Sequence, residues 1–433
     1  MKNKIKKVFK NSSQKEILTK GFSFLVFRLG GTVAGYFFTL FISNKFGVDI
    51  YGLVAICFSM FLMLSVVGRL GLDTNMIKFF SQDKNSSEAG IFYKSILKSL
   101  LLSSLLAFVI YLFRASIVID LFKEPKPELI PFLPWVLGAI PLWSITIISA
   151  SFLRAKKKNN AFAFFNNPSR FLFGLVLLII FYSFSQEPLI VFKAHFYAVA
   201  ISAVLSFGLV VYSLKKLQLK TQTNSWFFLK DSLPMMLSSS ILILLGWMDT
   251  FVMGVFETDA NVGIYNVSLK VASLSVFSLQ AINSILAPKI AKSYAEGDTD
   301  YKRLISFSTK LNFMISGVVV IVIIVFHNFL LGMFGEEFKA GATILFIFCV
   351  GQIINSFSGS VGVILQMTGK QKVHQNFVLS ALVINLTLTF VLTPIYGGVG
   401  AAIATVISMS FWNIAGAIYL KKMKGIKTYF KPF

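Results

Sequence analysis

Charged residues are scarce in this chain, and so are the residues that most enzymes use for catalysis or metal binding. Only 14% of the 433 residues are Asp, Glu, Lys or Arg, and there are two cysteines and three histidines. Both cysteines, Cys57 and Cys349, lie inside apolar runs, which disfavours a disulfide or a thiolate metal site. His195, His327 and His374 are far apart and are expected at a membrane interface. The sequence predicts no cofactor, no metal and no enzyme activity.

Hydrophobic residues, by contrast, make up 56% of the chain, and its mean hydropathy is +0.75. A run of roughly 20 apolar residues crosses the ~30 Å hydrocarbon core as a helix. Such runs recur throughout, so we predict an all-α integral membrane protein with twelve transmembrane helices. The second span is expected to break near Gly68 and Gly71. The predicted spans are 21–43, 51–76, 91–113, 129–153, 161–184, 189–213, 232–256, 261–287, 305–327, 341–365, 374–394 and 398–420.

Lysine and arginine are unevenly distributed among the segments between these spans. One alternate set of segments, including both termini, holds 29 of the 41 basic residues, and the other set holds six. The positive-inside rule therefore places both termini in the cytoplasm. The net charge of +23 is scattered over short loops, which argues against nucleic-acid binding. We predict a multi-pass protein of the bacterial cytoplasmic (inner) membrane.

The chain also resembles itself at an offset of 214 positions, where Tyr51 falls on Tyr265 and Lys156 on Lys370. Each half then has six spans in the same orientation, as in transporters built from two bundles. We expect two six-helix bundles in a V shape around a central cavity, with binding near the midplane. The predicted parts are a basic arm 1–20, a first bundle 21–214, a linker 215–231, a second bundle 232–420 and a basic tail 421–433.

Arg28 lies near the middle of the first span. A bare arginine there costs at least ~2.5–3.5 kcal/mol unless it faces a polar cavity or a partner. Thr32, Gly35 and Thr39 share its helical face and form a small, polar stripe. This pattern favours a water-accessible chamber, with snorkelling toward the cytoplasmic headgroups as the alternative.

Two further arginines lie within predicted spans. Arg170 follows a kink expected at Pro168, and cavity lining and snorkelling explain it equally well. Arg69 has Asp73 one helical turn away, and a local ion pair accounts for it adequately. Both are kept as candidate cavity cations, Arg69 as the weaker one.

Lys270 and Asp249 form the other charged pair of interest. Asn266, Ser273 and Gln280 continue the helical face of Lys270, which favours a wet or proteinaceous neighbour. Asp249 lies at a similar depth on the preceding antiparallel span, so we expect the two side chains to approach closely. The pair is either structural, or a coupling site at which protonation or ion binding frees Lys270 for substrate.

Taken together, these cations outnumber the single deep acid. An electropositive chamber suits an anionic substrate, and guanidinium groups match phosphate oxygens. Asn355 and Gln366, on one face of the tenth span, offer amides that suit sugar hydroxyls. Helix–helix packing through polar residues is the alternative explanation for each of them.

Short motifs in order along the chain resemble polysaccharide (O-antigen, Wzx-type) flippases of the multidrug/oligosaccharidyl-lipid/polysaccharide exporter superfamily. The resemblance covers nearly the whole chain. The motifs are Asn44-Lys45-Phe46-Gly47, Tyr51-Gly52, Gly71-Leu72, Asp249 through Gly254, Val262-Gly263-Ile264-Tyr265, Ala287-Pro288, Leu365-Gln366, Gly369-Lys370, and Pro394 through Gly400-Ala401-Ala402.

The resemblance implies flipping of an undecaprenyl-diphosphate-linked oligosaccharide from the cytoplasmic to the periplasmic leaflet. Related lipid II flippases carry essential cations in their first and eighth helices, where this chain has Arg28 and Lys270. They also have two further helices, which this chain lacks. A polysaccharide polymerase and a chain-length regulator are the expected partners, and coupling to a proton or sodium gradient is left open.

Two other functions compete with this interpretation. A membrane-embedded polymerase or ligase of polysaccharide assembly generally needs a sizeable external loop, and the outer loops here are short. A cation-coupled drug exporter of the same superfamily typically has an acid in the first helix, whereas this chain has Arg28.

Overall fold

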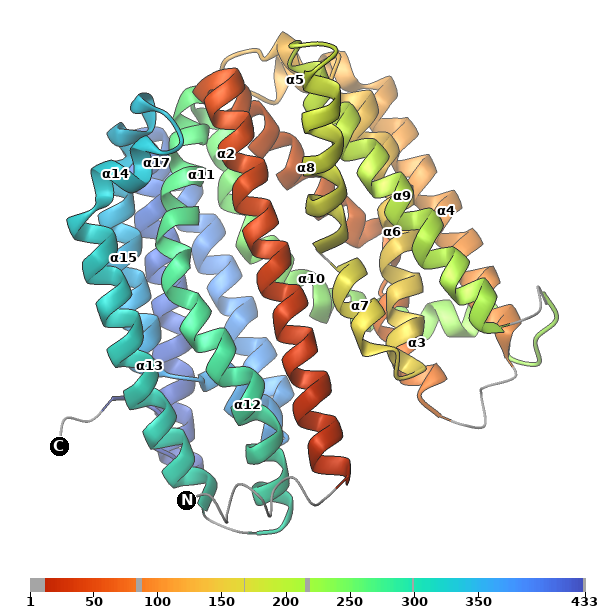
Figure 1. Cartoon of the computed structure of the whole chain (residues 1–433), viewed down its shortest axis with the longest axis vertical. Helices are drawn as coiled ribbons and strands as arrows, with labels where there is room; N and C mark the ends of the chain where they lie inside the picture. Colours follow the sequence, from red (N-terminus) through yellow and green to blue (C-terminus); the bar gives the residue numbers. More distant parts are fainter. Residues whose placement is uncertain (1–11, 83–87, 167, 215–218, 298–299, 431–433) are drawn as a thin grey trace. The chain divides into compact units, whose positions relative to one another are not determined.

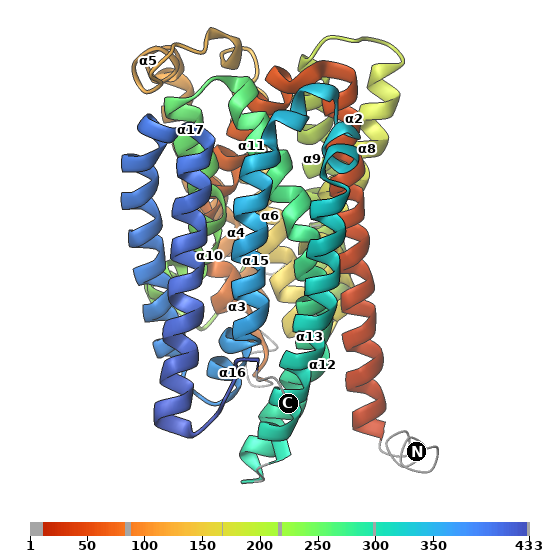
Figure 2. The ribbon, with the colours of Figure 1, turned by 90° about the vertical axis from the view of Figure 1, so that its left-hand side faces the viewer.

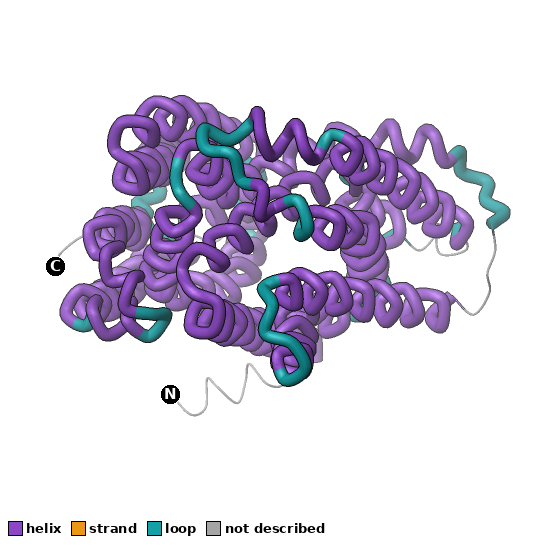
Figure 3. Tube along the Cα trace, turned by 90° about the horizontal axis from the view of Figure 1, so that it is seen from above, coloured by secondary structure: helices purple, strands orange, loops and turns teal. Residues whose placement is uncertain are grey.

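A computed structural model describes residues 12–82, 88–166, 168–214, 219–297 and 300–430, without the side chains of 12–25, 28, 238–239, 300 and 424. Within these ranges the regular structure is entirely helical (Figure 3). The predicted all-α class is therefore confirmed.

Eight helices are long and apolar enough to cross a membrane, or up to ten when each of two bent helix pairs counts as one span. Four of the eight, of 32, 37, 41 and 53 residues, are longer than one crossing requires, and the two longest contain a sharp break. The helix α2 (Ser12–Arg69) contains a non-helical residue at Gly47, and α17 (Gln371–Lys424) contains one at Gly397. Both positions match predicted boundaries between spans. The total of twelve stays a prediction.

The described chain groups into two compact units. We call Val26–Val255 the N-terminal unit; the C-terminal unit combines Met1–Leu25 with Phe256–Phe433. The N-terminal unit contains most of α2, then α3 (Leu72–Phe80), α4 (Ala89–Leu112), α5 (Arg114–Asp120), η2 (Pro127–Leu129), α6 (Leu133–Ala155), α7 (Asn159–Asn166), α8 (Pro168–Tyr182), α9 (Leu189–Leu214) and nearly all of α10 (Ser225–Phe256). The C-terminal unit contains α11 (Asp259–Ala272), η3 (Ser273–Ser275), α12 (Val276–Ala295), α13 (Asp300–Val325), α14 (His327–Gly332), η4 (Glu336–Gly341), α15 (Ala342–Ser358), α16 (Val361–Met367) and α17.

The core of the N-terminal unit forms around α6, which packs against α4 and α9 (Figure 1). Small residues let the helices approach closely, as is common in membranes. A Cβ on Gly68 of α2 would lie 2.8 Å from Cβ of Ser103 on α4 and 3.2 Å from Oγ of Ser144 on α6. Large aromatic side chains then fill the remaining space, and Phe92 and Phe152 are completely buried.

Glycine and proline interrupt the helices of this unit where the sequence predicts. The helix α2 ends at Arg69, Leu70 and Gly71 take left-handed φ values of 53° and 70°, and α3 follows. The second predicted break, at Pro168, separates α7 from α8, whose axes differ by 52°. Both predictions are confirmed.

The connection from α9 to α10 is tied to the start of α4. The Glu88 carboxylate accepts hydrogen bonds from the backbone N–H groups of Gln222 (3.0 Å) and Thr223 (3.2 Å) and from the Thr221 hydroxyl. The hydroxyl bond, supported by those from the two amides, lowers the pKa of Glu88 from its usual value.

The first part of α10, Ser225–Leu237, is bent by 50° from the part that follows. It lies partly within the predicted linker 215–231, where no helix was expected. Trp226 and Phe227 are 68% and 65% exposed, and Lys98 of α4 places its Nζ 3.8 Å from the Trp226 ring centre. Exposed aromatic rings beside lysines are typical of a helix at a membrane interface.

In the C-terminal unit, α15 packs against both α13 and α17, and the three helices lie side by side in Figure 2. Phe348 of α15 and Tyr265 of α11 are fully buried, with ring centres 5.4 Å apart. A second cluster joins α12, α13, α16 and α17 through buried residues such as Ile290, Ile305 and Ile364.

The segment after α17, which we call the C-terminal strap (residues 425–430), packs across the break between α15 and α16. Gly359 has a φ of +75° at this break, and a Cβ there would lie 2.7 Å from the carbonyl oxygen of Thr428. The Thr309 hydroxyl donates to that same oxygen at 2.7 Å, and the Phe430 N–H donates to the Phe357 carbonyl at 2.9 Å. The strap thereby supplies a donor to a carbonyl at the end of α15 and an acceptor to a hydroxyl of α13.

Candidate functional site

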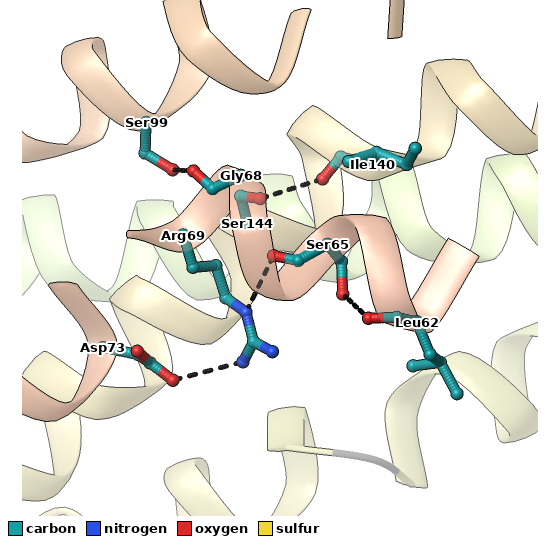
Figure 4. Close-up of polar contacts among 8 residues, drawn as sticks. All are labelled: Leu62, Ser65, Gly68, Arg69, Asp73, Ser99, Ile140 and Ser144. Carbon is teal, nitrogen blue, oxygen red and sulfur yellow. Dashed lines mark hydrogen bonds and ion pairs between the residues drawn. The ribbon is translucent and has the colours of Figure 1, made fainter. Parts of the chain in front are cut away.

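Arg69 lies at the break that ends α2. Its Nη1 is 3.2 Å from Oδ2 of Asp73, and its Nε donates to the Ser65 carbonyl at 3.1 Å (Figure 4). The Ser99 hydroxyl of α4 donates to the Gly68 carbonyl at 2.7 Å. The last carbonyls of a helix lack intrahelical donors, and the Ser99 hydroxyl supplies one to Gly68. The Arg69 side chain adds a further bond to its own helix one turn earlier.

The expected ion pair between Arg69 and Asp73 is thus confirmed. Arg69 is 7% exposed and its guanidinium is used locally, both by the carboxylate and by the backbone of its own helix. This geometry favours a structural role at the helix break. A role in binding substrate stays a prediction for Arg69.

Arg170, near the start of α8, is 3% exposed inside the N-terminal unit. Four aromatic rings surround its guanidinium, and we call these residues the aromatic cage. The distances from Cζ to the ring centres are 4.5 Å for Phe171, 5.3 Å for Trp143, 5.6 Å for Phe61 and 5.8 Å for Phe58. Cation–π attraction strengthens when the cation is desolvated, reaching about 2 kcal/mol or more.

His195 of α9 belongs to the same cluster. Its ring centre is 4.5 Å from that of Phe58 and 4.9 Å from that of Phe61. The expectation of an interfacial histidine is wrong at this position, because the imidazole is 2% exposed and packed among helices. The sequence alone could not reveal this, since the rings come from α2, α6, α8 and α9.

The aromatic cage holds the Arg170 side chain within the protein interior. The arrangement therefore differs from a cation exposed on an open chamber wall, which was one of the two predicted roles. Snorkelling, the other, is wrong, because a buried guanidinium does not reach headgroups. Whether Arg170 contacts substrate stays a prediction.

Asp249 of α10 is 1% exposed, and its Oδ1 accepts a hydrogen bond from the Thr250 N–H at 2.8 Å. It belongs to the N-terminal unit, whereas Lys270 belongs to the C-terminal unit. Their predicted approach therefore stays a prediction. Arg28 is helical within α2, but its side chain lies outside the described residues; Thr32, one turn further, is half-buried.

Lys270 is half-buried at the end of α11, directly before the 3-10 turn η3. The Ser273 hydroxyl donates to the Lys270 carbonyl at 2.7 Å, and Asn266 is buried with its Nδ2 donating to the Val262 carbonyl at 3.2 Å. Polar side chains on this segment thus bond to their own backbone where the helix is interrupted. Such local bonds compete with regular helical hydrogen bonds.

Beyond the turn, a hydroxyl network joins α12 to α13. The Ser278 hydroxyl lies 2.9 Å from Oδ1 of Asn312 and 2.8 Å from Oγ of Ser316, and Ser316 donates to the Ser275 carbonyl at 3.2 Å. Asn312 is completely buried. This network was not predicted from the sequence, although the serines at 273, 275 and 278 were a signal of a polar interruption.

Two predicted polar stripes are therefore interrupted in the structure. The stripe from Asn266 to Gln280 crosses η3, so half-buried Gln280 lies beyond the turn on a new helix, α12. The stripe from Asn355 to Gln366 crosses the break at Gly359, with Asn355 half-buried and Gln366 exposed. A single uninterrupted helix face was the wrong assumption at both places.

A sequence model of the family described as "Polysaccharide biosynthesis protein" matches residues 17–294. The chain belongs to this polysaccharide biosynthesis protein family. A second family model, described as "MatE", matches residues 234–391. The membership in the exporter superfamily that the motifs implied is confirmed.

Among similar proteins, a Haloferax volcanii protein named "Probable low-salt glycan biosynthesis flippase Agl15" is 27% identical over 183 residues. That alignment covers 42% of this chain and 39% of the Haloferax protein, so the match spans about two fifths of the relative's length.

Solved structures show the same fold at low identity. The lipid II flippase MurJ in an inward closed conformation has a TM-score of 0.73 at 14% identity, covering 94% of this chain and 88% of MurJ. An inward-facing multidrug resistance transporter of the MATE family has a TM-score of 0.70 at 16% identity, covering 92% and 99%. This polysaccharide biosynthesis family member is therefore a multi-pass membrane protein with a MATE/MurJ-like fold. The names of these proteins describe a probable flippase, a lipid II flippase and a multidrug resistance transporter.

Proposed function

We propose that this protein flips an undecaprenyl-diphosphate-linked oligosaccharide, an O-antigen, capsule or exopolysaccharide repeat unit, from the cytoplasmic to the periplasmic leaflet of the bacterial inner membrane. A polysaccharide polymerase and a chain-length regulator would take up the product. The observation that carries the proposal is the excess of cations in the membrane-spanning segments of a chain from this family. Arg28, Arg170 and Lys270 stand against Asp249.

The physical difficulty of the reaction lies in the diphosphate. Moving an uncompensated ion into a low-dielectric medium costs many kcal/mol, so an unaided crossing is prohibitively slow. Arginine offers planar donors that match phosphate oxygens, and lysine offers a point charge. Cations along the path replace the hydration of the diphosphate, while the polyprenyl tail stays in the bilayer. Alternating access then carries the head group across.

The test is reconstitution of the full chain in liposomes with a fluorescent lipid-linked oligosaccharide in the inner leaflet. We expect Arg28→Ala to slow leaflet transfer by about 10- to 150-fold, because a charge-assisted hydrogen bond contributes roughly 1.5–3 kcal/mol. The matched control is Lys292→Ala, which removes an exposed lysine paired with Glu296 at 3.8 Å. Transfer at the normal rate by the Arg28 variant would refute the proposal.

Asp249 offers a separate test of energy coupling. If its carboxylate carries a coupling proton or sodium ion, Asp249→Asn should remove the dependence of transfer on the ion gradient while substrate binding persists. Unchanged transfer with an unchanged gradient dependence would leave Asp249 with a structural role only.

One observation favours a second function, because the MatE model matches residues 234–391 and covers most of the C-terminal unit. A cation-coupled drug exporter would move cationic dyes out of cells that express the protein. Dye efflux without transfer of lipid-linked sugar would favour that function over the flippase.

A further inference from the structure

An apolar groove runs along the C-terminal unit between α13, α15, the second part of α17 and the C-terminal strap. Its volume is about 490 Å³, within the range of small-molecule sites. Ile414 and Ile418 of α17 and Ile353 of α15 line it and remain 46%, 48% and 39% exposed. Side chains this apolar and this exposed are suited to hydrocarbon.

Among the described residues that line the groove, Lys421 is the only charged one. It follows Ile414 and Ile418 along the same helical face, so it marks the end of the groove nearest the end of α17. Its Nζ lies 5.7 Å from the centre of the Tyr429 ring, which the strap contributes. The groove thus combines a hydrocarbon surface with an ammonium group at one end.

Further basic residues surround this end. Lys422 and Lys427 are exposed. Lys302, at the start of α13, lies beside the strap: its Nζ is 3.8 Å from the position that a Cβ on Gly425 would occupy. The sequence has five lysines after Tyr419. Clusters of this size beside a membrane span attract anionic lipid headgroups, at about 1 kcal/mol for each lysine near the surface.

We propose that this groove binds one anionic glycerophospholipid. One acyl chain lies along α15 and α17, and the headgroup phosphate sits on the ammonium of Lys421. A zwitterionic lipid would fill the same hydrocarbon surface but would bring its own cation to a basic cluster. Charge complementarity therefore selects a lipid with a net negative headgroup, such as phosphatidylglycerol. The site is independent of the flipped substrate.

The test uses the full chain with Ile418→Trp, which places a fluorescent ring at the exposed edge of the groove. The emission of the variant minus that of the parent protein is the emission of the new tryptophan. In liposomes that contain brominated lipid, quenching of this emission reports which lipid lies beside the groove. We expect brominated phosphatidylglycerol to quench it with an about five-fold preference over brominated phosphatidylcholine, the ratio that one lysine provides. Lys421→Gln in the same background should remove the preference.

The matched control is Lys422→Gln, which removes an equal charge from the next position. Lys422 does not line the groove, so its charge acts on all lipids at this surface and not on the one in the groove, and the preference there should stay within two-fold. Native mass spectrometry of the protein without the tryptophan gives a second readout, as one retained phosphatidylglycerol that is lost with Lys421→Gln. Equal quenching by both lipids, or equal losses in the two lysine variants, would overturn the proposal. Displacement of phosphatidylglycerol by a polyprenyl phosphate at equal concentration would assign the groove to the sugar carrier and overturn it as well.

Discussion

The substitution Gly71→Ala tests how closely the break after α2 approaches α10. Gly71 has a φ of +70°, and a Cβ there would lie 2.5 Å from the backbone nitrogen of Met236 and closer still to the Ser232 carbonyl oxygen. Both neighbours are backbone atoms of a helix, so no rotamer change can relieve the overlap. The left-handed conformation costs about 1–2 kcal/mol for a residue with a Cβ. Overpacking adds about 1–3 kcal/mol.

The expected destabilisation is therefore about 2–5 kcal/mol. At roughly 2–4 °C per kcal/mol for a unit of this size, the apparent Tm in detergent should fall by about 4–20 °C. The assay is tryptophan fluorescence during heating, with size-exclusion chromatography to count folded protein. The matched control is Gly297→Ala, because Gly297 has a φ of +71° but nothing within 4 Å of its Cβ position. It isolates the conformational cost, and a fall in Tm equal to that of Gly71→Ala would refute the role assigned to close approach.

Three other perturbations have definite expected outcomes. Glu88→Gln should speed hydrogen exchange at the Gln222 and Thr223 amides. In the parent protein, the protection of these amides should be present above the ordinary carboxyl pKa of 4.5 and be lost as the pH falls through the lowered pKa. The control Glu124→Gln should leave both the exchange rates and their pH dependence unchanged. Arg170→Lys should lower the apparent Tm by more than Arg154→Lys does, since the planar guanidinium meets four rings at position 170 but one at 154. The expected loss of stability at position 170 is about 2 kcal/mol. Equal shifts in Tm would contradict a stabilising role of the aromatic cage. Ser278→Ala should lower the free energy of unfolding by about 1–2 kcal/mol. Ser284→Ala should lower it less, because the Ser284 hydroxyl bonds only to its own helix. The reverse order would exclude the network as a stabilising link between α12 and α13.

The sequence was sufficient for features that depend on local or compositional physics. Apolar runs predict membrane helices because hydrocarbon leaves the backbone no other partners. Pro168 lacks an N–H and Gly71 tolerates positive φ, so both helix breaks could be predicted from residue type. The Arg69–Asp73 pair follows from the helical spacing of four residues.

Prediction from the sequence failed where the structure depends on contacts between distant segments or on an interruption that changes the helical register. The aromatic cage around Arg170 draws Phe58, Phe61 and Trp143 from two other helices, and no spacing within one helix reveals it. The stripe beginning at Asn266 presupposed an unbroken helix, but serine hydroxyls capture backbone carbonyls around η3 and end α11. Neither glycine nor proline marks that turn.

The C-terminal strap also has a consequence for the order in which the protein is made. The carbonyl of Thr428 meets the Thr309 hydroxyl over Gly359, yet the 54 residues of α17 separate the two sides of this contact in the chain. At translation rates of about 5–20 residues per second, α15 and α16 are in place roughly 3–10 s before the strap exists. During that interval the Thr309 hydroxyl has other acceptors, such as water or a carbonyl one turn earlier in α13. We therefore expect the strap to dock onto α13 and α15 only after both helices have been synthesised.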